Sequence, residues 1–446
     1  MSVTLSLAKL INKTNAEDLP AWTIHEAKRT LINMLGISLS ASASAGNQML
    51  LSWVKNENAA PRASIIGSSV KTSPFNAAMM NGFLAHLQDY DDTHFPTVLH
   101  PTSPVWPAVF AASEDTNASG LQALGSFVLG AEIACRLAMS VHPWHYDMGW
   151  HITGTTGVFG AAVATGKILN LDVPTLNMAI GQAGTYACGI REVFGSHSKP
   201  MHAAKAASNG LQSAYLAVSG FTGADDIIGG RRGFWEVLSP NGHNPDILLN
   251  NFCEHWELKN NGLKPYANGV VSHPIQDAVI FLRNNYSIDP LKVTSITAHV
   301  HPLVLELMNR PDPKRGLEGK FSFQHCAAAA LVDGAGHDAQ FSDEKIVDPL
   351  ISSVRSKVSA IIDNSLEEDQ VHLSISIDDG VTLEHSIDHA TGSPQNPMPD
   401  SVLERKFIDL AGEVMPAHNV SELLHVLWEL DKAPNLNKIS QLISIK

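Results

Sequence analysis

The sequence predicts a mainly α protein, in which a large all-helical bundle domain carries a smaller inserted α+β domain. Of the 446 residues, 44% are apolar and only 17% are charged, as expected when many helices are buried against other helices. Segments such as 120–141 are apolar on most sides and dense in small residues, which is typical of helices in the middle of a bundle. Alternating β-branched residues, the pattern of half-buried strands, gather between residues 293 and 387.

The N-terminal part reads as a series of helices joined by polar loops. Residues 1–60 have helical spacing of apolar side chains, and 61–73 is a short polar segment that predicts a loop with a small strand. Ser103 and Pro104 predict the N-cap and first residue of a helix, because the hydroxyl can accept a free backbone N–H and proline has none. Further helices are expected at 74–87, 120–141, 154–169, 173–188 and 201–218.

The character of the chain changes after residue 264. A strand is expected at 293–301, and two strands around Asp378-Asp379-Gly380 predict a hairpin. Helices are expected at 275–285, 321–333 and 343–363, and again at 402–446 after a segment rich in proline and glycine. The expected layout is a discontinuous helical domain, residues 1–266 and 400–446, with an α+β domain at 267–399.

Composition excludes several classes of function. The net charge is −14 and no basic run exceeds Arg231-Arg232, so nucleic-acid binding is not expected. Neither a secretory signal nor an uninterrupted apolar stretch of about 20 residues is evident, so we expect no membrane association and a cytoplasmic location. The four cysteines form no C-x-x-C pair. Cys135, Cys188 and Cys326 lie in apolar or small-residue runs and read as buried small side chains in a reducing compartment. The apolar helices favour a homodimer.

One connection concentrates polar residues that are unsuited to packing. The segment from 81 to 114 begins and ends as helix, and between these helices it crowds acids, histidines and a threonine into about a dozen positions. Clustered carboxylates on a loop held by a rigid scaffold are commonly functional. The residues concerned are Asp89, Asp91, Asp92, Thr93, His94 and His100.

Five blocks of sequence resemble the MmgE/PrpD family, which includes 2-methylcitrate dehydratases, cis-aconitate decarboxylases and iminodisuccinate epimerase. The resemblance spans nearly the whole chain and implies an enzyme without cofactor that acts on a small polycarboxylate in a cleft between the two domains. The blocks are DYDDTHFPTVLHP at 89–101, GWHITGTTGVFGAAVATGKIL at 149–169, SKPMHAAKAASNG at 198–210, KPY at 264–266 and FSFQHCAAAALVDG at 321–334.

The resemblance places Asp89, Thr93, His100, His151 and Lys264 in the active site. His151 also precedes a predicted helix, whose free N–H groups suit a substrate carboxylate.

A second basic group begins another predicted helix. Lys199, His202 and Lys205 lie at spacings of three, close to one helix face, and cations at a helix N-terminus are unfavourable unless an anion compensates. We therefore expect an anionic ligand there.

Metal and nucleotide cofactors are not expected. The acids and histidines of the connection could coordinate a divalent ion, but no H-E-x-x-H or comparable spacing appears and the resemblance is to enzymes without metal. The glycine patterns of dinucleotide and phosphate-binding loops are both missing.

Three departures from the family pattern bear on the reaction. Ser208 stands where decarboxylases carry a lysine, Gly269 where they carry a histidine, and His325 where relatives usually carry a tyrosine. Part of the decarboxylase set is thus missing, and the length and block pattern resemble iminodisuccinate epimerase most. The same departures would also fit a metabolite-binding scaffold with a decayed site.

The sequence therefore predicts an epimerase that moves a proton at the α-carbon of a small polycarboxylate. His151 and either Lys199 or Lys205 would form the acid–base pair, because burial can bring the pKa values of both residue types toward neutrality. Asp89 would orient them. A dehydratase of the 2-methylcitrate type and a decarboxylase of the cis-aconitate type remain alternatives. The residues expected to hold substrate carboxylates are Thr93, His100, His202, Lys264 and His325.

Overall fold

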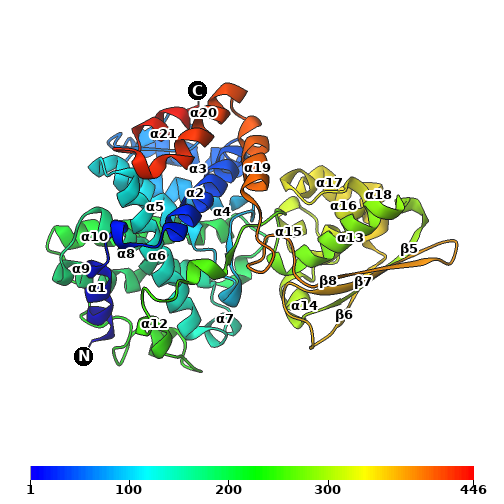
Figure 1. Ribbon diagram of the computed structural model, residues 1–446, viewed down its shortest axis with the longest axis horizontal. Coiled ribbons are helices and arrows are strands. Elements are labelled where there is room, and N and C mark those ends of the chain that lie inside the picture. The colour runs from blue at the N-terminus through cyan, green and yellow to red at the C-terminus, as the bar shows by residue number, and fades with distance from the viewer. Residues whose placement is uncertain (1, 446) are drawn as a thin grey trace.

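The computed structural model describes residues 2–445 and confirms a mainly α protein with a smaller α+β part. In Figure 1 the helices of both chain ends form one body, and the sheet with its helices projects to one side. The helices of the body are α1 (Val3–Lys13), α2 (Ala21–Ala41), α3 (Ala45–Glu57), α4 (Pro74–Leu87), α5 (Thr102–Thr116), α6 (Gly120–Val141), α7 (Trp144–Asp147), α8 (Ile152–Ile168), α9 (Val173–Ala183), α10 (Ser198–Val218), α11 (Phe234–Leu238), α12 (Asp246–Leu249), α19 (Asp400–Gly412), α20 (Ala417–Trp428) and α21 (Asn437–Leu442).

Small residues let the central helices of the body approach closely. A Cβ added at Gly130 of α6 would lie 2.6 Å from the Gly160 carbonyl oxygen of α8, and one at Gly210 of α10 would lie 2.6 Å from the Val158 oxygen. Helix α6 is long and apolar enough to cross a membrane, but 94% of its most apolar 18-residue stretch is buried inside the protein. It is therefore accounted for as a core helix of the bundle.

Two short strand pairs complete the body. Strand β1 (Ala63–Ser64) pairs with β2 (Lys71–Thr72) in the predicted loop. Strand β3 (Thr93–His94) pairs with β4 (Asn261–Gly262), and Thr93 lies opposite Gly262. The second pairing matters for the site, because it joins two segments that are far apart in the sequence and brings Lys264 beside the polar connection.

The α+β part is a four-stranded mixed sheet with helices packed against it. The strand order is β6-β5-β7-β8, with β5 parallel to β6 and antiparallel to β7. The predicted hairpin is confirmed as β7 and β8. Elements of this part are β5 (Val293–Val300), β6 (Val358–Ile362), β7 (Val371–Ile377), β8 (Thr382–Ile387), α13 (His273–Tyr286), α14 (Pro302–Met308), α15 (Gly316–Gly319), α16 (Phe323–Asp333), α17 (Asp343–Val347) and α18 (Pro349–Arg355).

Three local predictions were wrong. Cys188, which was expected to be buried, is exposed. The segment 343–363 is not one helix, because Pro349 starts a new helix and the β-branched run from Val358 forms the edge strand β6. Ser103 does not cap α5, which begins at Thr102 after Pro101. Its hydroxyl donates to the carboxylate of Asp91 instead, so the polar connection and the helix start are tied to each other.

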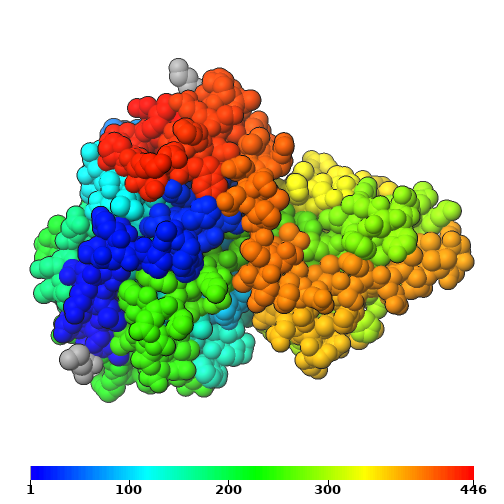
Figure 2. All heavy atoms as spheres, in the orientation of Figure 1, coloured from blue at the N-terminus to red at the C-terminus, as the bar shows by residue number. Residues whose placement is uncertain are grey.

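Two hydrophobic cores divide the protein. One is built from residues between 7 and 263 together with 398–443, and the other mainly from residues between 267 and 375. Figure 2 shows the C-terminal helices next to the N-terminal ones, with α19 beside the projecting part. Two buried lysines hold this junction together. Lys406 of α19 donates to the carbonyls of Tyr90 and Lys264, and Lys320 donates to those of Gln88 and Ala267.

Candidate active site

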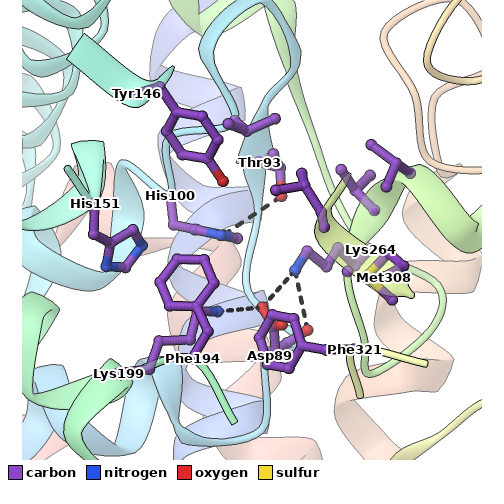
Figure 3. Close-up of a pocket in the computed structure, with 15 residues that line it drawn as sticks. Asp89, Thr93, His100, Tyr146, His151, Phe194, Lys199, Lys264, Met308 and Phe321 are labelled. Carbon is purple, nitrogen blue, oxygen red and sulfur yellow. Dashed lines mark hydrogen bonds and ion pairs between the residues drawn. The ribbon is translucent and has the colours of Figure 1, made fainter. Parts of the chain in front are cut away.

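Asp89 lies at the junction of the two cores, just beyond the end of α4. Its backbone is left-handed, with φ of 52°, a conformation that aspartate and asparagine tolerate better than most residues. Its Oδ1 accepts a hydrogen bond from Lys264 Nζ at 2.8 Å and lies 3.0 Å from Lys199 Nζ. All three side chains are buried, at 5% exposure or less. Figure 3 shows the two lysines reaching this carboxylate from different sides.

The charges of this group are strongly coupled. Burial alone would raise the pKa of Asp89, but the ammonium groups of Lys199 and Lys264 hold it well below its ordinary value, so the carboxylate stays ionised. Burial lowers the pKa of Lys199, and Lys264 lowers it further, while Asp89 opposes both effects. Lys199 therefore releases a proton more readily than an exposed lysine does.

Four histidines form a row along one side of the group. The ring centroids of His86 and His100 are 4.7 Å apart, and those of His86 and His151 are 5.7 Å apart. His202 continues the row with its Nδ1 2.9 Å from the Nδ1 of His151. Burial lowers the pKa of every one of these rings, to about 4 for His202. They are therefore neutral near pH 7, and burial disfavours their protonation.

The structure adds His86 to the candidate site and shows that Asp91 contacts it. His86 Nδ1 lies 2.7 Å from Asp91 Oδ2, and both side chains are fully buried. His86 Nε2 and Asp91 Oδ1 have no hydrogen-bond partner among the described residues. The prediction omitted His86 because a lone histidine inside an apolar helix gives no signal. Its place on α4, three residues before Asp89, was the available clue.

Two polar residues of the connection have structural roles. Asp92 accepts hydrogen bonds from Thr102 and Asn261, and burial raises the pKa of its carboxyl to about 7. His94 bridges Thr97 Oγ1 at 2.8 Å and Glu257 Oε2 at 3.1 Å.

A pocket opens onto this group. Six of the nine predicted site residues line it: Asp89, Thr93, His100, His151, Lys199 and Lys264. The rest of the lining was not predicted, because it comes from apolar side chains on segments that the sequence does not connect. It consists of Val98, Tyr146, Phe194, Gly269, Val270, Val271, Leu307, Met308 and Phe321.

Three predicted residues do not line the cavity. Lys205 points toward Phe75, with Nζ 5.9 Å from the ring centroid. Six helical residues turn the side chain by about 120° relative to Lys199, so the two lysines do not share a face. His202 lies behind His151. His325 bonds the Gln340 carbonyl through Nε2 at 2.9 Å, which directs its ring away from the cavity.

A group of potential metal ligands also lies here. Ligand atoms of His86, Asp89, Asp91 and His100 lie within 4.8 Å of one another. However, the two lysine ammonium groups already occupy the near side of the Asp89 carboxylate. A divalent cation at this oxygen would face two positive charges within contact distance, so the arrangement favours a lysine-based acid–base site.

A buried carboxylate between two lysines, beside neutral histidines and a cavity, is the construction of an enzyme site for acid–base work on an anion. The MmgE/PrpD N-terminal domain matches residues 5–246 and the MmgE/PrpD C-terminal domain matches residues 266–431. The chain therefore belongs to the MmgE/PrpD family.

Similar proteins share the full length of the chain. Cis-aconitate decarboxylases of Mus musculus and Homo sapiens are each 25% identical to it, over 99% of this chain and over 93% and 94% of their own lengths. The cis-aconitate decarboxylase of Aspergillus terreus is also 25% identical, over 99% of this chain and 96% of its own length. These relatives are named as decarboxylases, which favours the lyase alternative over the epimerase that the sequence blocks predicted.

Proposed function

We propose that the protein is a cofactor-independent decarboxylase of a small unsaturated polycarboxylate of the cis-aconitate type. The observation that carries the proposal is the pair of buried lysines on Asp89 at the cavity, with His151 across from Lys264 (Figure 3). Lysines supply the positive charge that an anionic substrate needs in a chain with a net charge of −14, because a cleft can concentrate its own local field.

The reaction has one bond-breaking step and one proton transfer. The carbon–carbon bond to the departing carboxylate breaks, and carbon dioxide leaves. The electron pair forms a new double bond as the old one shifts, which places negative charge on the carbon next to another carboxylate. That carbon then takes a proton. Lys199 is the proposed donor, because burial and Lys264 lower its pKa and so make its ammonium group a stronger acid than that of an exposed lysine.

The other lining residues have binding roles in this proposal. Lys264 and Thr93 hold the carboxylates that remain on the product, and Asp89 fixes the positions of both lysines. His100 and His151 are neutral, so their ring N–H groups donate hydrogen bonds to carboxylate oxygens, and Lys199 takes a new proton from solvent after each turnover.

The departures from the family pattern weigh less in the folded protein than in the sequence. Ser208 donates to the Lys205 carbonyl at 3.3 Å and does not line the cavity, and His325 also lies outside it. Only Gly269 changes the lining itself. The main reason for preferring epimerisation is therefore reduced to a single position.

Reaction in D₂O tests the proposal. Incubation of the protein with cis-aconitate is expected to release one carbon dioxide and place one deuterium on the product carbon per turnover. The rate should be unchanged after exhaustive chelation, because side-chain acids and bases do the chemistry. Gas measurement and proton NMR follow both events. Deuterium incorporation at a stereocentre of another polycarboxylate without carbon dioxide would establish the epimerase, and loss of water from 2-methylcitrate would establish the dehydratase.

A further inference from the structure

The cavity has two unlike sides, and the apolar side is the larger. Lys199, Lys264, Thr93 and the two histidines face it from the helical body and the polar connection. Beside Lys264 and across from His151 and Lys199, the segment after Gly269 and the end of α14 supply only aliphatic and thioether groups. A small polycarboxylate that was charged at every end would place one carboxylate against this wall. The wall side chains are Val270, Val271, Leu307 and Met308.

Met308 closes the space where the wall could have carried a polar group. A Cβ at position 269 would lie 2.3 Å from Met308 Sδ, so no larger side chain fits there while Met308 keeps its place. Met308 itself is fully buried. Its thioether is a weak hydrogen-bond acceptor that cannot donate, and it suits contact with an alkyl group. Figure 3 shows it on the same side of the cavity as Lys264.

The fixed charges around the cavity also limit what can bind. Lys199 and Lys264 are the two lysines in the lining, and both contact Asp89. Lys406 lies behind the main chain of Lys264, where burial holds its pKa well below the ordinary value. Lys320 is paired with Asp338 at 2.6 Å. None of the four wall side chains is charged. Arg310, two residues beyond Met308, donates to the Phe194 carbonyl. A third substrate carboxylate would therefore meet no cation in the wall itself, and burying an unpaired charge is costly.

We infer that the preferred substrate is a dicarboxylate with a short alkyl group that lies against Met308, in place of the third carboxylate of cis-aconitate. This rests on the proposed function and names its substrate class: a glutaconate that carries a methyl to isopropyl substituent at carbon 3. Such a molecule keeps the carboxylate that leaves, the double bond that shifts and the carbon that takes the proton. Its two carboxylates take the two lysines, and its alkyl group fills the apolar side.

Calorimetry with two nearly isosteric ligands tests the inference. Cis-aconitate is 3-carboxyglutaconate, so 3-isopropylglutaconate of the same double-bond geometry differs only at the group that would face Met308. At pH 7.5 the wild-type protein is expected to bind the isopropyl compound on the order of tenfold more tightly or better, because an unpaired buried charge opposes cis-aconitate. Equal or tighter binding of cis-aconitate would overturn the inference.

A variant pair tests the role assigned to Met308. Met308→Lys is expected to reverse the preference, and Met308→Leu, which keeps the volume, is expected to preserve it. The wild-type comparison stands on its own if the lysine variant does not fold. Binding and turnover separate this inference from the proposed function. Tight binding of 3-isopropylglutaconate without release of carbon dioxide would support the substrate class and contradict the decarboxylase.

Discussion

Asp89→Asn is expected to remove nearly all activity and to destabilise the fold by about 3–5 kcal/mol, the usual cost of removing one partner of a buried ion pair. The loss arises because Lys199 and Lys264 would lie close together without the carboxylate that holds them at 3.0 Å and 2.8 Å. Asparagine tolerates the left-handed backbone of residue 89, so the substitution isolates the charge. We expect kcat/KM to fall by about 10²–10⁴-fold, the range for a lost acid–base group.

The effect on stability should depend on pH in a defined way. The folded-state pKa of Asp89 lies below its ordinary value of 3.8, so its contribution is fully present above that value and lost as pH falls through the lower folded pKa. Urea unfolding should therefore show a constant difference between wild type and variant from pH 8 to about 5, and a smaller one in stronger acid.

A surface pair provides the control for Asp89→Asn. Asp431 pairs with Lys28 at 2.6 Å and is partly exposed, so Asp431→Asn should cost no more than about 1 kcal/mol. An Asp89→Asn protein with wild-type rate and stability would show that the lysines do not depend on this carboxylate.

The fold was largely predictable because its signals are local. Tertiary packing reinforces the local patterns of these elements. Examples are the apolar, small-residue helices α6 and α8 and the alternating strands of the β7–β8 hairpin. The failures occurred where a distant partner decided the outcome. Ser103 is drawn to Asp91 rather than to its own helix, and Val358–Ile362 becomes a strand because β5 offers it an edge.

The candidate site likewise contains residues that could be predicted from the sequence and residues that could not. Polar residues in dense blocks, such as Asp89 and His151, could be singled out, since such residues are costly to bury without a purpose. The apolar wall could not, because Met308 and Phe321 look like ordinary core residues until the two cores come together. Lys205 was a different error, since its spacing of six residues from Lys199 looked helical but fell one residue short of the i+7 position on the same face.

Lys264→Met is expected to lower kcat/KM by about 10²–10⁴-fold, with a smaller effect on stability than Asp89→Asn. Lys264 donates to both the side chain and the carbonyl of Asp89 and is the proposed holder of a substrate carboxylate. Methionine keeps most of the volume of the buried side chain. Asp89 retains Lys199 as its partner, so no buried charge is left alone. Steady-state kinetics with cis-aconitate and with the 3-alkylglutaconates would measure the loss.

Lys205→Met is the matched control for Lys264→Met. Lys205 is on α10 like Lys199, but it points toward Phe75 and away from the cavity. This variant should keep wild-type kinetics within about twofold, as is usual for a surface substitution. Loss of activity in Lys205→Met together with normal activity in Lys264→Met would reverse the assignment of the two lysines.

The most direct test of the site is a crystal structure with a bound, unreactive dicarboxylate. A saturated compound such as 3-methylglutarate has no double bond to shift, so it can occupy the cavity without reacting. We predict one carboxylate within about 3 Å of the Nζ atoms of Lys264 and Lys199, the distance of a charged hydrogen bond, and its methyl group beside Met308. A ligand bound elsewhere, with this cavity left empty at saturating concentration, would contradict the assignment of the active site.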